Sequence, residues 1–420
     1  MCHLEPTKRI FVVCLGISIM VCSLIYLSVD VPTEPKSREE CRPFAPQCKP
    51  FLVGYNSGLR WRRQNCQVEH YITNNSLDCS KLIMGFNFIT APLSKEEKDY
   101  PLAFILTIHK ELEVFIRLLR AIYMPQNVYC IHVDAKAPLE YKVSVQKLAS
   151  CFDNVFVASR SETVTYAGYS RLQADLNCMG ELVRSKIRWR KVLNLCGQDF
   201  PIMSNLELVR YMQSEEWKDK NMTPGVKQPP KFSSRTRMQH IEMVDNSVRR
   251  SGRTKDPPPR RMQVYFGTAY YALTREFVKF VLTSQVAQEL LMWSRDTYSP
   301  DEHFWVTLNH IKEAPGSYLT GGWGGSIRAI KWSDQEGTSH DGCKGRYVRD
   351  ICVYGTDDLP WILKSAAMFA NKFESGTHPE ALDCLEQWHR IKVLKQATVP
   401  IDPTWLLAIP YSNSTDMQNY

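Results

Sequence analysis

Hydrophobic positions follow two alternating patterns over the first half of the chain. Short runs of consecutive apolar residues, typical of strands buried on both faces of a sheet, alternate with longer segments whose apolar residues recur every three or four positions. The runs predict strands over 102–109, 128–133, 155–158 and 192–196, and the longer segments predict helices over 112–124, 139–151, 169–183 and 206–212. This alternation predicts a mostly parallel sheet covered by helices on both faces.

The pattern changes after the fourth predicted strand. Residues 217–262 are rich in proline and show no regular period, which predicts a long irregular segment of the kind that often carries function or moves. Residues 263–274 predict a pair of tyrosine-rich strands, and residues 276–293 predict a helix. The whole pattern predicts a domain over residues 79–397 of the α/β class, built on a Rossmann-like sheet with flanking helices.

The first thirty residues show a different pattern. Residues 10–29 are almost uncharged and mostly apolar, and a stretch of this length can cross a bilayer. Lys8 and Arg9 precede it, and positive charge keeps that side cytosolic. A cleaved signal peptide is the alternative interpretation, but no small-x-small cleavage site follows Val29. The sequence therefore predicts a type II membrane protein, with a cytoplasmic tail over 1–9, a signal anchor over 10–29, a stem over 30–78 and a C-terminal tail over 398–420.

Composition and charge narrow the class of protein. The hydrophobic content of 44% and the charged content of 23% are those of an ordinary globular protein. The net charge is +8, and the densest basic run, residues 249–261, contains no aromatic residue and encloses three consecutive prolines. Nucleic-acid binding usually combines basic and aromatic residues on a regular element. The composition therefore argues against a nucleic-acid partner and favours a solvated loop near a negatively charged ligand or a membrane surface.

Cysteines and glycosylation sequons predict exposure to the secretory lumen. Three of the 14 cysteines lie in the predicted tail and anchor, and the other eleven follow them, in a compartment where disulfides persist. An odd number leaves at least one cysteine free or paired between chains. The lack of any C-x-x-C pair argues against a zinc site. Sequons at Asn74, Asn221 and Asn413 predict N-glycosylation in the lumen.

Residues 296–305 contain the strongest candidate for catalysis. Ser299, Pro300 and Glu302 form an S-x-x-E pattern that predicts a capped helix start, with Ser299 as the N-cap and Pro300 as the first helical residue. The same segment places the carboxylates of Asp301 and Glu302 among aromatic residues, where a carboxylate can act as a general base on a sugar hydroxyl. The local pattern alone favours the capping role, and the rest of the chain favours the catalytic role.

Polar residues follow each predicted strand. They are His109 and Lys110 after the first strand, Asp134 after the second, Arg160 after the third, and Gln198 and Asp199 after the fourth. Ligands of open α/β sheets bind beyond the carboxyl ends of the strands. These residues therefore predict a site large enough for a nucleotide.

Charge balance at such a site requires a cation. The segment after the second strand reads Asp134-Ala135-Lys136, and no D-x-D pair for a divalent metal occurs in the chain. A departing nucleoside diphosphate then needs basic side chains, since preorganised cations stabilise developing phosphate charge as a metal does. Arg349 and Lys372 are the candidates, and an ordinary surface position is the alternative for each.

Five blocks of sequence share a longer pattern. They are residues 119–127, 129–134, 171–179, 296–302 and 369–373. In this order they resemble the core 2 type β-1,6-N-acetylglucosaminyltransferases, glycosyltransferase family 14, and the resemblance runs from about residue 79 to about residue 390. It implies a GT-A-like fold in its metal-independent variant, no cofactor, UDP-N-acetylglucosamine as donor and an O-glycan acceptor. The tail, single anchor and stem fit that family's Golgi arrangement, with the catalytic domain in the lumen.

The resemblance implies roles for individual residues. Glu302 matches the catalytic base, which takes the proton from the C6 hydroxyl of the acceptor as that oxygen attacks C1 of the donor sugar. Arg349 and Lys372 match the cations that hold the UDP diphosphate in place of a metal. The residues that match the uridine and ribose side of the donor site are Ile108, His109, Lys110, Asp134 and Tyr166.

The resemblance also implies a disulfide pattern. It pairs Cys79 with Cys151, Cys130 with Cys178 and Cys343 with Cys352, pairs Cys384 with one of Cys41, Cys48 or Cys66, and leaves Cys196 unpaired.

The chain departs from the family on the acceptor side. Trp332 matches an aromatic residue at the acceptor site, but Asp334 stands where some members carry a second aromatic, and residues 233–240 do not align with the family's basic segment. The sequence thus predicts an inverting transferase that moves N-acetylglucosamine from UDP to a 6-hydroxyl of galactose or N-acetylgalactosamine. A transferase for another UDP-sugar such as UDP-xylose, and a non-catalytic glycan- or nucleotide-binding homologue, are the alternatives.

Overall fold

The computed structural model describes residues 48, 72, 78–325 and 327–407 of the chain. The predicted cytoplasmic tail, the predicted anchor and most of the predicted stem lie outside these residues, as do Asn74 and Asn413. Within the described part of the chain, no helix is both long enough and apolar enough to cross a membrane.

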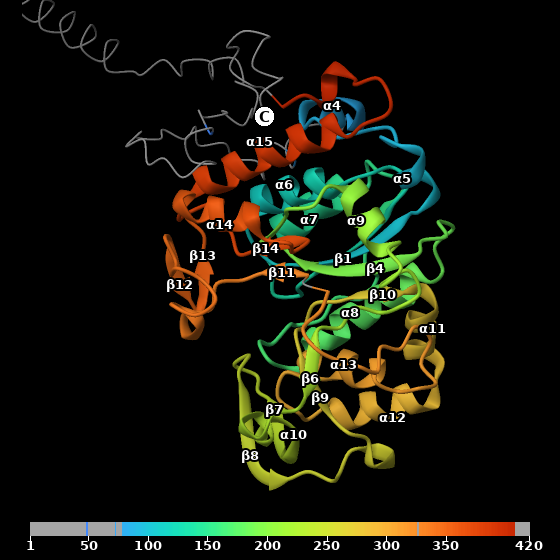
Figure 1. Cartoon of the computed structure of the whole chain (residues 1–420), viewed down its shortest axis with the longest axis vertical. Coiled ribbons are helices and arrows are strands. Elements are labelled where there is room, and N and C mark those ends of the chain that lie inside the picture. Colours follow the sequence, from blue (N-terminus) through green and yellow to red (C-terminus); the bar gives the residue numbers. More distant parts are fainter. Residues whose placement is uncertain (1–47, 49–71, 73–77, 326, 408–420) are drawn as a thin grey trace, which may run out of the picture. The chain divides into compact units, whose positions relative to one another are not determined.

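A five-stranded sheet forms the centre of the domain (Figure 1). Its strands are β1 (Leu102–Ile108), β2 (Val128–Val133), β3 (Val155–Val157), β4 (Lys191–Cys196) and β10 (Ala272–Thr274), in the order β10-β4-β1-β2-β3. The first four pair in parallel, and β10 joins β4 antiparallel. The predicted mostly parallel α/β sheet is confirmed.

Helices cover both faces of this sheet (Figure 1). One face carries α6 (Leu112–Ile122), α7 (Leu139–Ala149) and α9 (Asn205–Met212), and the other carries α8 (Tyr169–Leu182), α11 (Arg275–Thr283), α12 (Gln285–Ser294) and α13 (Phe304–Asn309). Phe104 and Leu106 of β1 pack into the first core, whereas Ala103 and Ile105 pack into the second. Because both faces are covered, all of β1 is buried, which explains its continuous apolar run.

Smaller elements complete the domain. They are α4 (Cys79–Gly85), α5 (Lys95–Asp99), α14 (Leu359–Lys364), α15 (Pro379–Lys395), the sheet β11 (Arg328–Ala329)-β14 (Phe369–Asn371)-β5 (Asp199–Pro201), and the hairpin of β12 (Arg346–Val348) with β13 (Ile351–Val353). The predicted elements of the first half of the chain differ from the observed ones by one or two residues at their ends.

Three predictions for residues 217–293 are corrected. The single helix predicted over 276–293 is two helices, α11 and α12, because Ser284 between them has extended backbone with φ −75° and ψ 132°. The strands predicted over 263–274 do not pair with each other: β9 (Tyr265–Gly267) pairs with β6 (Gly225–Lys227), and β10 pairs with β4. The segment predicted as irregular contains β6, α10 (Ser234–Arg237) and a hairpin of β7 (Met238–Glu242) with β8 (Val248–Thr254).

Four disulfides join the described cysteines. They are Cys48–Cys384, Cys79–Cys151, Cys130–Cys178 and Cys343–Cys352, and Cys196 carries a free thiol. These are the pairs that the resemblance implies, with Cys48 as the partner of Cys384. The Cys48 disulfide reaches α15 across 336 residues, and Ile72 is 1% exposed within the first core. Two positions of the predicted stem therefore belong to the packed domain.

The start of the predicted C-terminal tail also packs on the domain. Trp405 is buried, and its indole nitrogen donates to Thr90 Oγ1 at 3.2 Å. The backbone N–H of Thr398 donates to the carbonyl of Leu93 at 2.8 Å. The packed domain therefore extends to at least residue 407.

Asn221 lies in the interior, so the predicted glycosylation there is wrong. Its side chain is 0% exposed, and Nδ2 donates to the carbonyl of Pro315 at 2.8 Å and to Asn309 Oδ1 at 3.1 Å. Its Oδ1 accepts from the backbone N–H of Thr274 at 2.9 Å. A glycan on Nδ2 would break these bonds and has no path to solvent.

Candidate active site

Glu302 lies on a short 3-10 helix, η3 (Pro300–Glu302), directly before α13. The predicted capping box is absent, because Ser299 has left-handed backbone (φ 46°, ψ 62°) and its side chain makes no cap hydrogen bond. A tertiary contact holds this conformation, since the N–H of Ser299 donates to the carbonyl of Ala167 at 2.8 Å. The predicted capping box is therefore wrong, whereas the predicted helix start is confirmed, with Ser299 at the N-cap position and Pro300 as the first residue of η3. The Glu302 carboxylate is free of a capping role.

The partner of Glu302 is Arg235 on α10. The two side chains form an ion pair and are 31% and 27% exposed respectively. Three aromatic rings surround the guanidinium: Phe232, Phe266 and Tyr298 lie with their centroids 4.6, 5.2 and 5.3 Å from its Cζ. Sequence reasoning missed this residue, because it lies in the segment 233–240 that the resemblance leaves unaligned. The basic residues of that segment were the available signal.

The surroundings shift the pKa values of Asp301 and Glu302, the last two residues of the segment 296–302, which we call the base segment. Burial raises the pKa of Glu302, and the positive charge of Arg235 opposes the rise. Burial raises the pKa of Asp301 to about 7, with Arg171 opposing and the Glu302 charge adding to the rise. A general base is most effective when its pKa lies near the working pH, and shifted pKa values gather at functional sites. The structure therefore suits Glu302 to proton abstraction.

The predicted phosphate-binding cations lie together. Arg349 and Asp350 form the tight turn of the β12–β13 hairpin, both with positive φ (51° and 64°), as two-residue hairpin turns require. Lys372 follows β14, and its Nζ donates to the carbonyl of Val348, the residue before Arg349, at 3.0 Å. Burial lowers the pKa of Lys372, the charge of Glu374 opposes this shift, and the charges of Lys110 and Arg349 add to it. An anion placed here would relieve this repulsion.

Asp134 has a cation where a D-x-D pair would have a second carboxylate. Its Oδ2 accepts from Lys136 Nζ at 3.0 Å, and its Oδ1 accepts from the Lys136 backbone N–H at 2.8 Å. Asp134 and Lys136 together offer one carboxylate, and the lysine already neutralises its charge. This arrangement does not fit a divalent metal that is held by two carboxylates.

One other group in the described residues has the spacing of metal ligands. It comprises Cys343, Cys352 and Asp358. The two cysteines are joined by a disulfide, so they offer no thiolate to a metal.

Tyr166 connects the base to the cations. Its ring centroid lies 4.9 Å from Cζ of Arg349. Burial raises its pKa, Tyr298 and Glu302 add to the rise, and the charge of Arg349 opposes it. The next residue, Ala167, binds the base segment through Ser299 as described above. The structure therefore brings the predicted base and the predicted donor cations to one place.

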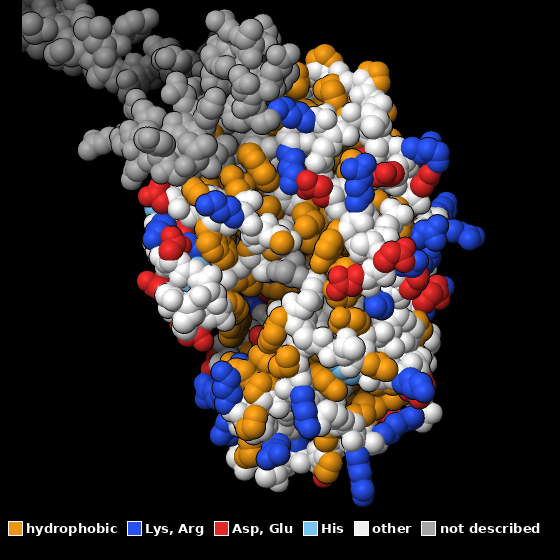
Figure 2. Space-filling view, in the orientation of Figure 1, with side chains coloured by type: hydrophobic (Ala, Val, Ile, Leu, Met, Phe, Trp, Pro, Cys, Tyr) orange, Lys and Arg blue, Asp and Glu red, His pale blue; other side chains and the backbone are white. Residues whose placement is uncertain are grey.

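The remaining predicted residues surround this place. Ile108 is buried, and its carbonyl accepts from the N–H of Asp134 at 2.9 Å. His109 is exposed, and the charges of Lys110, Asp134 and Arg349 act on it. Trp332 forms a β-bridge with Ile351, beside the turn that carries Arg349. Figure 2 shows a hollow with charged side chains inside it, between the part of the domain that carries the β12–β13 hairpin and the part that carries β6 and β9.

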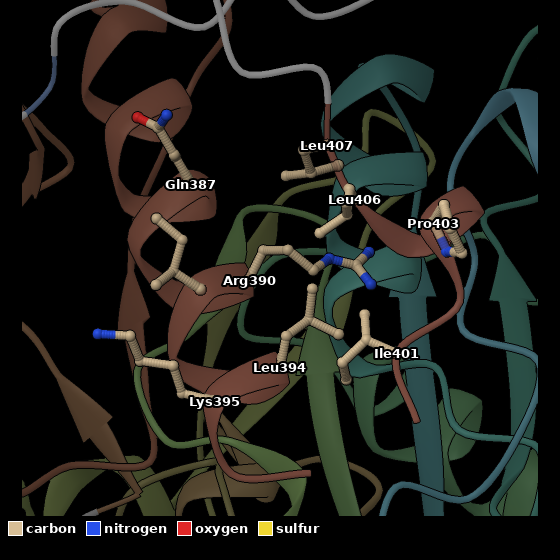
Figure 3. Close-up of a pocket in the computed structure, with 9 residues that line it drawn as sticks. Gln387, Arg390, Leu394, Lys395, Ile401, Pro403, Leu406 and Leu407 are labelled. Atoms are coloured by element: carbon tan, nitrogen blue, oxygen red, sulfur yellow. The ribbon is translucent and has the colours of Figure 1, made fainter. Parts of the chain in front are cut away.

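A cavity of about 290 Å³ lies elsewhere, between α15 and residues 401–407 (Figure 3). Its wall is mostly apolar, with Leu394, Ile401 and Leu406 around the stem of Arg390 (Figure 3). None of the residues of the candidate active site lines it. It is therefore separate from the site that contains Glu302.

Known proteins are similar in sequence to this chain over the region that contains the candidate site. Residues 102–363 match the family model described as Core-2/I-Branching enzyme. The chain is 49% identical over 424 residues to a human protein named probable beta-1,3-galactosyl-O-glycosyl-glycoprotein beta-1,6-N-acetylglucosaminyltransferase 7, with 96% of this chain and 97% of that protein covered. It is 50% identical over 345 residues to the human N-acetyllactosaminide beta-1,6-N-acetylglucosaminyl-transferase, with 80% and 85% covered.

A third relative is more distant. The chain is 40% identical over 350 residues to the human beta-1,3-galactosyl-O-glycosyl-glycoprotein beta-1,6-N-acetylglucosaminyltransferase 3, with 81% of this chain and 79% of that protein covered. The family match includes the base segment and the β12–β13 hairpin.

Proposed function

The chain belongs to the Core-2/I-branching enzyme family, and on that premise we propose that it transfers N-acetylglucosamine from UDP-N-acetylglucosamine, in β-1,6 linkage, to a galactose or N-acetylgalactosamine of O-glycans. It is a glycosyltransferase, since relatives at 40–50% identity are named β-1,6-N-acetylglucosaminyltransferases. The observation that carries the proposal is that two adjacent residues contact both halves of the site. Tyr166 lies with its ring centroid 4.9 Å from Cζ of Arg349, and Ala167 accepts from the N–H of Ser299, three residues before Glu302, at 2.8 Å.

The proposed reaction is a single displacement that inverts C1 of the donor sugar. Glu302 accepts the proton of the acceptor's C6 hydroxyl while that oxygen bonds to C1 and the bond from C1 to the UDP oxygen breaks. Arg349 and Lys372 stabilise the negative charge that develops on the departing diphosphate. Arg235 opposes the rise in the pKa of Glu302, so it favours the ionised carboxylate that the reaction needs.

The proposed donor site uses no metal and no cofactor. Its uridine and ribose side is formed by Ile108, His109, Lys110, Asp134 and Tyr166, and its diphosphate side by Arg349 and Lys372. The pairing of Asp134 with Lys136 supports this proposal, because it removes the carboxylate that a metal would bind. Trp332 is proposed as an acceptor contact, since it lies beside the turn that carries Arg349.

We also propose that the domain works in the Golgi lumen, as part of a single-pass type II membrane protein. Disulfides persist in the secretory pathway and are rare in the cytosol, and four of them join the described cysteines. The predicted anchor over residues 10–29 precedes the domain and has the length of a bilayer span.

The test uses the secreted portion, residues 31–420, with UDP-N-acetylglucosamine and excess EDTA. O-glycan disaccharides and N-acetyllactosamine chains serve as acceptors, UDP-xylose serves as the competing donor, and the linkage of the product is determined by NMR. A β-1,6 product formed in EDTA would support the donor, the linkage and the metal-free site together.

Other outcomes would contradict parts of the proposal. Donor binding without transfer to any acceptor would favour a non-catalytic homologue. Transfer that needs added Mn²⁺ or Mg²⁺ would contradict the metal-free site, and preferred transfer of xylose would contradict the donor.

A further inference from the structure

The N-terminus of α8 is capped by a residue from a distant part of the chain. Gly168 holds the N-cap position and makes no side-chain cap hydrogen bond. The carboxylate of Glu242, at the end of β7, accepts instead from the backbone N–H of Ser170 at 2.8 Å and from its Oγ at 2.7 Å. A carboxylate at a helix N-terminus satisfies an unpaired N–H and interacts favourably with the helix dipole.

This contact needs a glycine at position 168. A Cβ atom added there would lie between 2.5 and 2.8 Å from the carboxyl atoms of Glu242. The Oγ of Ser170 also accepts from the backbone N–H of Thr165 at 2.8 Å. The segment 165–170 therefore folds directly around the Glu242 carboxylate, and a single methyl group at residue 168 would displace it.

The segment 165–170 also contacts both halves of the proposed active site. Tyr166 faces the guanidinium of Arg349 on the donor side. Ala167 accepts from the backbone N–H of Ser299 in the base segment. A change in this segment therefore affects the donor cation and the base segment at once.

The element that Glu242 belongs to carries the partner of the base. Directly before β7, α10 presents Arg235 to Glu302. The hairpin and α10 are both bound to the base segment. The N–H of His240 in β7 donates to the carbonyl of Asp296 at 2.8 Å, and the N–H of Tyr298 donates to the carbonyl of Arg235 in α10 at 2.9 Å. Nearly all of β8 is exposed, and a two-stranded hairpin has little stability of its own, so these contacts hold it in position.

We propose that Glu242 is a positioning residue that couples donor binding to acceptor binding. A diphosphate bound by Arg349 orders Tyr166 and, through it, the segment 165–170. Because Glu242 binds Ser170, this ordering also fixes the β7–β8 hairpin, which holds Arg235 against Glu302 on the acceptor side. The inference rests on the proposed function, because it uses the same donor and acceptor.

Coupling of this kind is measured as the ratio of the affinity for acceptor with UDP bound to the affinity for acceptor without UDP. Acceptor binding is titrated by calorimetry with and without saturating UDP, with galactosyl-β-1,3-N-acetylgalactosamine and N-acetyllactosamine as the probes. Four proteins are compared: wild type, Glu242→Gln, Gly168→Ala and the control Glu276→Gln, which removes an exposed carboxylate paired with Lys279. We expect UDP to tighten acceptor binding about fivefold or more in wild type and control, the lower end of typical coupling.

The variants at Glu242 and Gly168 break the contact in different ways. Glu242→Gln removes the charge and one acceptor oxygen, whereas Gly168→Ala leaves Glu242 intact and pushes its side chain away. Both should reduce the ratio to about one while UDP alone still binds, since coupling is lost when the connecting element no longer distinguishes the two states.

Three results would overturn the inference. They are an unchanged ratio in both variants, a ratio of one in wild type, and a loss of UDP binding in both variants, which would indicate a purely structural role. Transfer activity of the wild type is measured in parallel. Its absence together with absent UDP binding would refute the proposed function itself, whereas normal transfer with unchanged coupling would refute only the role of Glu242.

Discussion

Among the segments of this chain with the pattern S-x-x-E, those at Ser204 and Ser299 use it in opposite ways. At the start of α9, Ser204 has extended backbone, its Oγ accepts from the N–H of Glu207 at 3.1 Å, and Glu207 Oε2 accepts from the N–H of Ser204 at 2.9 Å. At η3, Ser299 is left-handed, no side-chain cap forms, and the carboxylate of Glu302 pairs with Arg235. The same local pattern yields a structural cap in one place and a candidate base in the other.

The difference comes from a single backbone donor. A capping box requires the N-cap N–H to bind the glutamate three residues later. The N–H of Ser299 is already used, since it donates to the carbonyl of Ala167. A glutamate excluded from capping can keep its carboxylate for chemistry, and the charges around the two residues differ accordingly.

The pKa values of the two glutamates shift in opposite directions. Burial acts to raise the pKa of Glu207, but Lys392 and the Ser204 N–H outweigh it and the pKa is lowered. At Glu302 burial prevails over Arg235, and the pKa is raised. A low pKa suits a permanent ion pair, and a raised pKa suits a group that must accept a proton.

The largest expected effect follows from Glu302→Gln. We expect transfer to fall by about 10² to 10⁴, the range for loss of a general base. The melting temperature should change little, because the Glu302 side chain makes no capping hydrogen bond and its ion pair with Arg235 is partly exposed, where such pairs contribute little. Initial rates and thermal unfolding of the two proteins check this. The matched variant Glu207→Gln should keep the wild-type rate, and equal rate losses in both would contradict the comparison.

Arg235→Gln should shift the pH dependence of the reaction. Without the Arg235 charge, burial acts unopposed and the pKa of Glu302 rises further. The base must be ionised, so the acidic limb of kcat/KM against pH should move to higher pH in the variant. A pH profile measured on wild type and variant checks this. Arg249→Gln, which removes an exposed arginine of the neighbouring β7–β8 hairpin, should leave the limb in place, and a shift there too would point to a general charge effect.

The two serines should differ in their contribution to stability. Ser204→Ala should cost about 1 kcal/mol, as loss of an N-cap does, because its Oγ accepts from Glu207 and also donates to Gln396. Ser299→Ala removes no capping bond and should cost less than half as much. Urea unfolding of the two variants measures both values. Equal costs would show that Ser299 has a capping role after all.

The smallest expected effect is on the pH dependence of stability. Because the folded pKa of Glu207 lies below its ordinary value, its contribution is present at pH values above that ordinary value and is lost as pH falls through the folded pKa. Glu207→Gln should therefore destabilise the protein at pH 7, by less than about 1 kcal/mol for a partly exposed pair, and by less at about pH 3. Unfolding curves at the two pH values measure this, and a cost that is the same at both would exclude the charge as its cause.

Several elements could be predicted because local sequence is sufficient for them. The continuous apolar runs of β1 and β2 reflect burial on both faces, and each strand end lies within one residue of its prediction. The break at Ser284 could not be predicted, because the apolar period continues across it from α11 into α12. The partners of β9 and β10 also lie outside any local window.

Some residues of the candidate site could be predicted from the sequence, and others could not. Glu302, Arg349 and Lys372 were found from their sequence motifs. In the structure Arg349 lies beside Tyr166, Lys372 binds the residue before Arg349, and the segment of Glu302 binds Ala167. Arg235 and Glu242 were missed, since each acts through a contact across more than 60 residues of sequence: 67 to Glu302 and 72 to Ser170. No sequence pattern reports which carboxylate a distant arginine will meet.

The sequence by itself determined the α/β class, the strands of the main sheet and the residues available for chemistry, because apolar periodicity and residue type are local properties. Only the tertiary structure decided which S-x-x-E forms a cap, whether the sequon at Asn221 is accessible, and where Glu242 binds. Each of these depends on a donor, an acceptor or a volume supplied by a distant segment. One hydrogen bond from Ser299 to Ala167, made only in the folded chain, separates the candidate base from an ordinary helix cap.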